Sequence, residues 1–245
     1  MVLFNYITNK VTHYELSPGT NDNIVQGNYF NPLVGYPLYS IFNYPSAKLD
    51  NLGNPRGYLN GQVSEDYTSI LNSTNPSNLA YNGSATPLYF GSIINNFSYR
   101  QFSLSVGIGY KLDYYFRRTS LNYTSLFGGN FNQADFTKRW QNPGDENHTY
   151  VPSMIYPADP TRDEFYTYSN SLVDRADNIR LQDLKFSYSL NRQSIRNLPF
   201  KTLQFYVYAN NLAILWRANH EGLDPDSPYA SPATKSVSFG LNASF

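Results

Sequence analysis

The chain of 245 residues contains no cysteine and has no excess of charge of either sign. The absence of cysteine excludes disulfide frameworks, thiolate zinc sites and cysteine nucleophiles, although many exported proteins also lack disulfides. Its 18 Lys and Arg residues are balanced by 18 Asp and Glu residues. Because affinity for nucleic acids depends on an excess of positive charge, we expect no nucleic-acid partner.

Long hydrophobic runs are also absent. No stretch approaches the ~18 consecutive apolar residues of a transmembrane helix. Residues 1–10 (MVLFNYITNK) lack the basic start and the continuous apolar region of a secretory signal peptide. Either the chain is a complete cytosolic protein, or the segment that carries its targeting signal is missing. Transmembrane β-strands escape a test of this kind because their hydrophobic residues only alternate.

Asn, Ser, Tyr and Thr account for most of the polarity of the chain. Charged residues make up 15% of it, below the roughly 25% of ordinary soluble domains. Mean hydropathy is −0.48, although 23 Tyr and 16 Phe raise the aromatic content to 17%. Strong helix formers are scarce and β-formers are plentiful. The composition predicts an all-β protein with an uncharged polar face.

Residues 102–116 show the clearest pattern, with an apolar or aromatic residue at every even position. Period two predicts one strand with one apolar face, and its length is well beyond the roughly 5–6 residues of an average strand. Shorter alternating segments occupy residues 184–191, 203–210 and 236–245. Weaker candidate strands cover about 2–15, 34–44 and 88–100. Such lengths are typical of strands that cross a bilayer.

The connections between these strands alternate in length. Residues 100–101 and 192–199 are short connections, whereas 45–87, 118–178 and 216–234 are medium or long. Outer-membrane barrels have short periplasmic turns and longer extracellular loops. This pattern places the C-terminus on the periplasmic side. A soluble extracellular carbohydrate-binding β-sandwich, whose strands also alternate, remains the alternative interpretation.

The last strand ends the chain on an aromatic residue, as outer-membrane proteins commonly do. Phe239, Leu241 and Phe245 stand at alternate positions of this strand. We therefore predict that these three residues form the terminal strand that the barrel-assembly machinery reads.

No arrangement of residues predicts catalysis, a cofactor or a metal site. The three histidines, His13, His148 and His220, are far apart and lack the spacing of zinc ligands, and no Gly-x-Ser-x-Gly elbow is present. The Asp163-Glu164 pair lies in an acidic, proline-flanked loop and is interpreted as a solvated turn. The Asp224-Pro225-Asp226 segment is interpreted in the same way, with ligand binding as the alternative.

Aromatic side chains are the residues with a plausible binding role, because sugar rings stack on Trp and Tyr faces while Asn and Ser supply hydrogen bonds. An aromatic girdle at the headgroups, or packing within the loops, is the competing interpretation. The candidate substrate-binding residues are Trp140, Tyr166, Tyr168 and Trp216.

Several segments, taken in order, resemble the C-terminal part of SusC/RagA-type TonB-linked outer-membrane transporters. The resemblance covers most of the chain from roughly residue 28 onward. Its segments are 35–42 (GYPLYSIF), 95–105 (NNFSYRQFSLS), 139–145 (RWQNPGD), 178–188 (NIRLQDLKFSY), 203–212 (LQFYVYANNL), 222–226 (GLDPD) and 238–245 (SFGLNASF). Each segment alone is weak, but their order and spacing together are specific.

The resemblance implies a 22-stranded barrel with an N-terminal plug, which imports oligosaccharides or peptides. It also implies energy from an inner-membrane TonB complex and a SusD-like surface lipoprotein that caps the outside. At about 10 residues per strand, 22 strands need roughly 220 residues before any loop. The expectation is therefore that residues 1–245 supply about seven or eight strands of the C-terminal barrel segment, without the signal peptide, the TonB-contacting segment or the plug. Such a piece could not transport by itself.

Some relatives carry an acidic calcium-type loop after the segment that resembles 35–42. In this chain, residues 50–57 (DNLGNPRG) lack acidic side chains at alternating positions, so we predict no calcium site.

Overall fold

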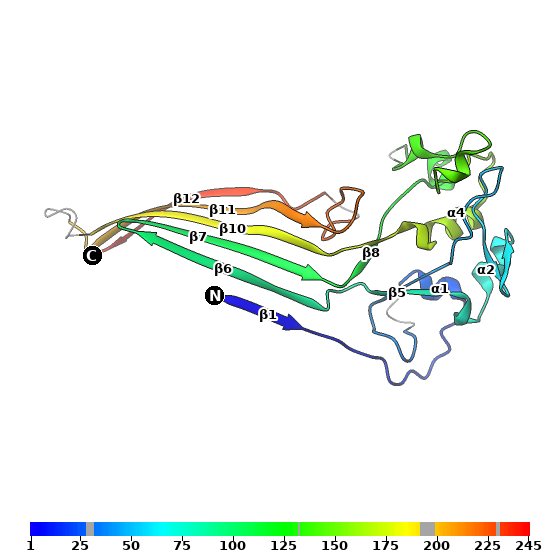
Figure 1. The fold of residues 1–245 in the computed structure, drawn as a ribbon, viewed down its shortest axis with the longest axis horizontal. Coiled ribbons are helices and arrows are strands. Elements are labelled where there is room, and N and C mark those ends of the chain that lie inside the picture. The colour runs from blue at the N-terminus through cyan, green and yellow to red at the C-terminus, as the bar shows by residue number, and fades with distance from the viewer. Residues whose placement is uncertain (28–31, 132, 192–198, 229–230) are drawn as a thin grey trace. The chain divides into compact units, whose positions relative to one another are not determined.

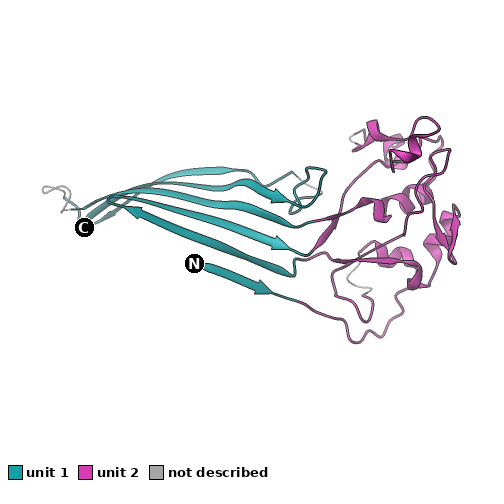
Figure 2. Ribbon diagram, viewed as in Figure 1, with its two compact units in different colours: residues 1–7, 87–113, 176–245 teal, residues 8–86, 114–175 magenta. Residues whose placement is uncertain are grey.

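The computed structural model describes residues 1–27, 32–131, 133–191, 199–228 and 231–245. The chain forms two compact units. Unit 1 comprises residues 1–7, 87–113 and 176–245, and unit 2 comprises residues 8–86 and 114–175 (Figure 2). The connections predicted to be long therefore contribute most of a compact unit of their own.

Unit 1 is one antiparallel sheet of six strands in the order β1-β6-β7-β10-β11-β12 (Figure 1). The strands are β1 (Val2–Tyr6), β6 (Tyr89–Tyr99), β7 (Phe102–Leu112), β10 (Asn178–Asn191), β11 (Thr202–Arg217) and β12 (Ser236–Ser244). Strands β10 and β11 contain 14 and 16 residues, far more than an average strand. The all-β prediction is confirmed, with six strands in the large sheet where seven or eight were expected.

The register of the sheet places the apolar residues of neighbouring strands on one side. Partners in an antiparallel ladder point to the same face, so alternation in each strand adds up across the sheet. We call this side the apolar face. Its main members are Val2, Phe4, Tyr6, Ile93, Phe97, Tyr99, Phe102, Leu104, Val106, Ile108, Leu184, Phe186, Tyr188, Leu203, Phe205, Val207, Val237, Phe239 and Leu241.

The opposite side, the polar face, carries small and polar residues. Its main members are Ser92, Asn96, Ser103, Ser105, Gly107, Gly109, Lys111, Arg180, Asp183, Lys185, Ser187, Gln204, Tyr208, Asn210, Ser238 and Asn242. Ser103 and Ser187, on β7 and β10, share a hydrogen bond of 2.6 Å between their hydroxyls. The polar face is thus able to bind water or a polar ligand.

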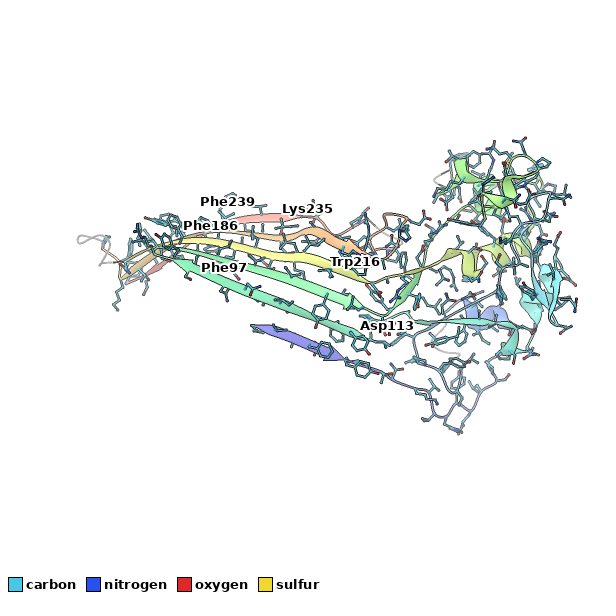
Figure 3. All side chains as sticks on the ribbon, in the orientation of Figure 1. Phe97, Asp113, Phe186, Trp216, Lys235 and Phe239 are labelled. Carbon is cyan, nitrogen blue, oxygen red and sulfur yellow. The ribbon has the colours of Figure 1, made fainter. Side chains whose placement is uncertain are left out.

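Unit 1 has almost no hydrophobic core of its own. Among the described residues, only Ala176 and Ala209 of unit 1 are buried hydrophobic residues. Large side chains of the apolar face stay open: Phe97 is 59% exposed and Phe239 is 80% exposed (Figure 3). The other sheets of the described chain have two strands each and belong to unit 2, so no second sheet within unit 1 forms a sandwich with this one.

The strand expected over residues 102–116 is interrupted at Asp113. Strand β7 ends at Leu112, and Asp113 has a left-handed φ of 61°. The backbone N–H of Asp113 donates to Asp177 Oδ1 at 2.7 Å, which fixes this turn. A positive φ cannot continue a strand, and Asp is among the few residues that tolerate it. The alternation resumes in β8 (Tyr115–Arg117), which pairs with β9 (Val173–Arg175) in unit 2.

The weaker strand predictions were partly wrong. Residues 88–100 agree with β6, but 2–15 shortens to β1, and 34–44 shortens to β2 (Ser40–Asn43). The tight turn predicted at residues 100–101 joins β6 to β7 as expected. The short connection predicted at 192–199 falls mostly on residues 192–198, which lie outside the described residues.

Unit 2 is built from short elements around a hydrophobic core. Its remaining strands are β3 (Gly57–Leu59), β4 (Gln62–Ser64) and β5 (Ala80–Ser84), and its helices are α1 (Asn21–Val25), α2 (Tyr67–Asn72), α3 (Tyr123–Phe127) and α4 (Pro160–Thr167). Single turns of 3-10 helix cover Pro76–Asn78, Phe136–Lys138, Asp145–Asn147 and Asn170–Leu172. The main core cluster consists of Ile24, Val25, Phe42, Tyr44, Tyr67, Ile70, Leu71 and Phe165.

Helix α4 illustrates how local sequence positions this core. Asp159 caps the helix by accepting hydrogen bonds from the backbone N–H groups of Thr161 and Arg162, and Pro160 occupies the first turn. The helix then buries Phe165 completely. At eight residues it is also short, and among the described residues no helix is long and apolar enough to cross a membrane.

Gly53 supports a first prediction about unit 2. Gly53 is buried with a φ of +80°, and a Cβ at this position would lie 2.6 Å from the Ser153 Cβ and 2.7 Å from the Trp140 ring. Gly53→Ala should therefore destabilise unit 2 through both backbone strain and overpacking, by about 2–5 kcal/mol. Gly61→Ala is the matched control, because Gly61 has the same φ and a Cβ added there would meet no atom within 4 Å. Equal losses in thermal unfolding would contradict the packing part of this account.

Candidate functional site

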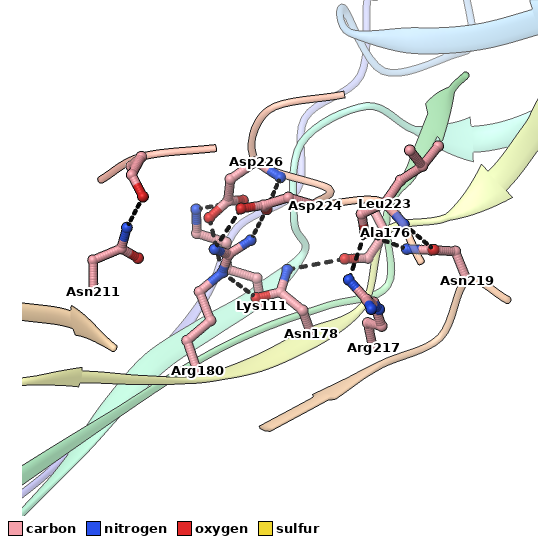
Figure 4. A network of polar contacts seen from close by, with 11 residues as sticks. Lys111, Ala176, Asn178, Arg180, Asn211, Arg217, Asn219, Leu223, Asp224 and Asp226 are labelled. Atoms are coloured by element: carbon pink, nitrogen blue, oxygen red, sulfur yellow. Dashed lines mark hydrogen bonds and ion pairs between the residues drawn. The ribbon is translucent and has the colours of Figure 1, made fainter. Parts of the chain in front are cut away.

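The polar face carries a cavity of about 450 Å³ where β10 and β11 approach the loop formed by residues 218–228, which we call the 218–228 loop. The cavity lies close to the network of polar contacts drawn in Figure 4. Its lining consists of Arg180, Gln182, Asp183, Asn210, Asn211, Asp224, Asp226, Ser227, Ala233 and Thr234. Nearly every lining residue offers a hydrogen-bond donor or acceptor, so the cavity suits a polar ligand.

Arg180 is the centre of the network. Its guanidinium donates two hydrogen bonds to the carboxylate of Asp224, and its Nε donates to Asn178 Oδ1 at 2.9 Å. The same Nε lies 3.2 Å from Asp226 Oδ2. The side chains of Arg180 and Asp224 are only 9% and 10% exposed. A two-pronged Arg–carboxylate pair with this little exposure is stronger and more specific in geometry than a surface ion pair.

Lys111 extends the network to a third strand. Its Nζ donates to Asp226 Oδ1 at 2.9 Å. The two carboxylates of the loop thus face two cations of the sheet, one from β7 and one from β10 (Figure 4). We call Lys111, Arg180, Asp224 and Asp226 together the ionic cluster.

The pKa of Asp224 is lowered by this arrangement. Burial alone would raise it, but hydrogen bonds from Arg180 and from the Asp226 amide outweigh the burial, with help from the charges of Arg180 and Lys111. The resulting stabilisation is complete above the ordinary pKa of an aspartate and is lost as the pH falls through the lowered value. At neutral pH the ionic cluster is therefore fully formed.

Asp183 defines the other side of the cavity. Its carboxylate accepts hydrogen bonds from the Tyr208 hydroxyl and from Asn210 Nδ2, the latter at 2.9 Å. Among the described residues, no Phe, Tyr or Trp belongs to the lining of this cavity. The cavity can thus form hydrogen bonds through amide and carboxylate groups, but it has no ring on which a sugar could stack.

Two further cavities adjoin the first. One of about 250 Å³, next to β1 and β6, shares Arg180 and Gln182 with it, and one of about 360 Å³ shares Arg180, Asn211 and Asp224. A Cβ added at Gly109 would lie 2.4 Å from Gln182 Oε1, so the glycine leaves room for the Gln182 side chain. Arg180 thus borders all three cavities, which we call together the groove. The first cavity is lined mainly by polar residues, whereas Leu3, Phe90 and Tyr110 border the second.

The four predicted substrate-binding aromatics do not line this groove. Trp216 lies at the end of β11 and is 47% exposed. Tyr166 is 2% exposed, burial raises its pKa, and its hydroxyl bonds to that of Ser120. Trp140 donates from Nε1 to Glu146 Oε2 at 3.0 Å. Tyr168 borders a separate cavity of about 410 Å³ in unit 2, together with Asn122, Thr124 and Glu164.

The terminal-strand residues lie where they were predicted. Phe239 and Leu241 belong to β12, and Phe245 follows its last residue. All three are strongly exposed, at 80%, 56% and 77%. Their role in assembly stays a prediction.

Sequence reasoning missed the ionic cluster. The Asp224-Pro225-Asp226 segment was interpreted as a solvated turn, but the side chain of Asp224 is only 10% exposed and pairs with an arginine 44 residues earlier. A signal was present, because Arg180 and Lys111 are the rare cations of strands whose polar face is otherwise mostly uncharged. Which cation meets which acid depends on strand register, which the sequence alone did not provide.

A pair of carboxylates in unit 2 gives a second prediction. Gln26 Nε2 donates to Asp22 Oδ2 at 2.7 Å and to Glu164 Oε1 at 3.3 Å. Burial raises the pKa of Glu164, and the charge of Asp22 raises it further. A carboxyl whose pKa is raised by folding costs stability as the pH rises through and above its ordinary value. Glu164→Gln should therefore stabilise unit 2 at neutral pH, with the gain vanishing at low pH, as measured by denaturant unfolding.

Glu146 provides a control because its pKa is shifted in the opposite direction to that of Glu164. It accepts hydrogen bonds from Trp140 Nε1 and from the Gly144 backbone N–H, and both lower its pKa. Glu146→Gln should destabilise unit 2 at neutral pH. If both variants shift stability in the same direction, the electrostatic explanation for Glu164 is wrong.

Comparison with known proteins gives matches among solved structures. The chain is similar to the structure of the RagAB peptide transporter, with 20% sequence identity and a TM-score of 0.63. The match covers 86% of this chain and 23% of that chain. The RagAB peptide importer in the "closed-closed" state is also 20% identical, with a TM-score of 0.65, over 99% of this chain and 26% of that chain. The "open-open" state gives a TM-score of 0.60 at 20% identity, over 84% of this chain and 22% of that chain. No protein-family model and no curated protein matches.

At this identity the likeness shows the fold. The chain spans about a quarter of the length of these transporter chains. The resemblance of the sequence motifs to SusC/RagA-type transporters is a separate observation and stays a prediction.

Proposed function

We propose that this chain forms part of the barrel wall and extracellular loops of a TonB-dependent importer in the outer membrane of a Gram-negative bacterium. The observation that carries the proposal is the separation of faces in unit 1. A single sheet with long strands exposes one continuous apolar face, and the described residues of unit 1 supply almost no core to cover it. In water such a face is a liability, whereas in a bilayer it is the lipid-contacting surface.

Each part of the chain has a role in this proposal. The apolar face contacts lipid, and the polar face lines the lumen through which the ligand passes. Unit 2 is extracellular, and the turn at residues 100–101 and the C-terminus are periplasmic. Plug movement driven by an inner-membrane TonB complex acts through parts of the transporter beyond this chain. Neither catalysis nor a nucleic-acid partner is part of the function.

A SusD-like surface lipoprotein is the proposed extracellular partner. Unit 2 exposes Phe131 at 82%, Tyr156 at 83% and Met154 at 51%. Tyr156 packs edge-on against Phe127, with ring centroids 5.2 Å apart. Exposed aromatic residues and methionine are enriched in the cores of protein interfaces. We propose these four residues as the contact surface for the lipoprotein.

The proposed substrate is a peptide or an oligosaccharide. Amide and carboxylate groups line the main cavity, which has no aromatic lining in the described chain, and this favours the backbone amides of a peptide. Trp216 is 47% exposed, and Tyr168 and Trp140 are half-buried, so these three side chains could contact a substrate, whereas Tyr166 would act from beneath the surface. Oligosaccharide uptake is the second candidate, because such rings stack on sugars.

The direct test is uptake by cells that carry or lack the gene for this chain. Cells with the gene should accumulate a fluorescent peptide mixture or an oligosaccharide mixture faster than deletion cells, and the difference should vanish without TonB. Equal uptake of both mixtures by the two strains would overturn the proposal. A difference confined to one mixture identifies the substrate class.

A further inference from the structure

The charges of the ionic cluster are segregated between the sheet and the loop. Both cations, Lys111 and Arg180, come from strands of the polar face. Both anions, Asp224 and Asp226, come from the 218–228 loop. If the loop moves away, two positive charges remain beside the 450 Å³ cavity that Arg180, Asp224 and Asp226 border.

The loop is held in place mainly by side chains. Its first residue is anchored by the bond from the Ala218 N–H to the Asp177 carbonyl at 2.9 Å. Beyond that anchor, Arg217 of β11 donates to the Leu223 carbonyl at 3.4 Å. Asn219 bonds twice to the backbone of Leu223, and these two contacts brace the loop internally. Residues 224–226 are joined to the sheet through the bonds and ion pairs of the ionic cluster. An anion that competes for Arg180 and Lys111 therefore acts on the main attachment of this part of the loop.

The two carboxylates are preorganised to bind this cation pair. The Asp226 N–H donates to Asp224 Oδ1 at 2.9 Å, and the Ser227 N–H donates to the Asp224 carbonyl at 3.0 Å. Pro225 between the two acids fixes its own φ and restricts the residue before it. The turn thus presents two carboxylates in a fixed geometry, as a rigid dicarboxylate ligand would.

We propose that Arg180 and Lys111 form a carboxylate-binding site of the polar face, and that Asp224 and Asp226 occupy it as a built-in competitor. A ligand carboxylate, such as the C-terminus or an acidic side chain of a peptide, displaces the loop and takes over its bonds to the guanidinium. The planar guanidinium matches a carboxylate through two parallel N–H···O bonds, which gives selectivity for this group. The site's part in uptake rests on the proposed function, but its ability to bind carboxylates does not.

The test uses the protein purified in detergent, with glutarate as the probe and uncharged glutaramide as the comparison. Asp224→Asn combined with Asp226→Asn removes the competitor, so this double variant should bind glutarate about tenfold more tightly than the wild type in calorimetric titration. Adding Arg180→Gln to the double variant should abolish that gain. Glu221→Gln is the matched control, because it removes one negative charge from the same loop at a residue outside the ionic cluster.

Hydrogen exchange on the unmutated protein provides an independent measurement. Glutarate should speed the exchange of the Ala218 amide, whose bond to the Asp177 carbonyl joins the loop to the sheet, roughly tenfold by opening the loop, whereas glutaramide should not. The proposal is overturned if the double variant binds no more tightly than the wild type, if the Glu221 variant gains as much, or if both probes change exchange equally. Because no transport is measured, failure here leaves the proposed function intact, and failure of uptake leaves the binding result intact.

Discussion

Replacing Phe239 by lysine is expected to remove most of the protein from the outer membrane. Phe239 lies on the apolar face of β12 with 80% of its surface exposed, opposite Val207 of β11. A lysine that faces lipid at the middle of the bilayer costs about 2–4 kcal/mol of barrel stability, a large part of the total for a folded protein. The substitution should be made in the gene that encodes this chain and measured as the amount recovered in outer-membrane fractions.

Ser238→Lys is the matched control for this experiment. Ser238 is the adjacent residue of the same strand, is also exposed, and lies on the polar face opposite Tyr208. It differs from Phe239 in the face to which it points rather than in depth. Lysine at Ser238 should leave the membrane level nearly unchanged. Equal loss with both variants, or equal tolerance of both, would contradict the assignment of the two faces.

Deletion of Phe245 is expected to have the second large effect. Phe245 directly follows β12, in which apolar residues alternate, and this strand is the predicted signal for the barrel-assembly machinery. If the assembly machinery reads this strand, most of the protein should fail to reach the outer membrane and should be degraded. Immunoblots of fractionated cells would measure this loss.

Phe200 distinguishes recognition from simple packing. Its ring contacts that of Phe245 edge-on, with centroids 5.0 Å apart. Phe200→Ser removes this contact but leaves Phe245 in place. If recognition is the cause, the Phe200 variant should assemble much better than the deletion. A comparable loss with both changes would assign the effect to ring packing.

The long strands of unit 1 could be predicted because period two survives over many residues. In β12, and in β10 from Leu184 onward, the alternation depends on local sequence alone, and each residue faces the side that its parity assigns. The register shift between Leu181 and Asp183 reverses this parity in the first part of β10. Interruption of the strand after Leu112 could not be predicted in the same way. Aromatic residues continue at the even positions past Asp113, and the turn depends on a hydrogen bond from its N–H to Asp177, 64 residues away.

Unit 2 and the ionic cluster were the harder parts. The core of unit 2 joins Tyr67 to Phe165, residues from two connections that no local period links. The pairing of Arg180 with Asp224 needs the register of β10 and the path of the loop at once. Tyr166, predicted to contact substrate, is instead covered by neighbours that the sequence places far away, such as Ser120. The core of unit 2, the Arg180–Asp224 pair and the burial of Tyr166 all depend on contacts between segments that are far apart in the sequence.

The most direct test of the central claim is a cysteine scan of β12. Residues 1–245 contain no native cysteine, so within them each introduced thiol is the one reactive site. Single cysteines would replace Val237, Ser238, Phe239, Leu241 and Asn242, which are all exposed. In isolated outer membranes, a water-soluble maleimide should label positions 238 and 242 but not 237, 239 and 241, because lipid covers the apolar face alone. Labelling of all five positions would show that both faces meet water, and the barrel-wall assignment would be wrong.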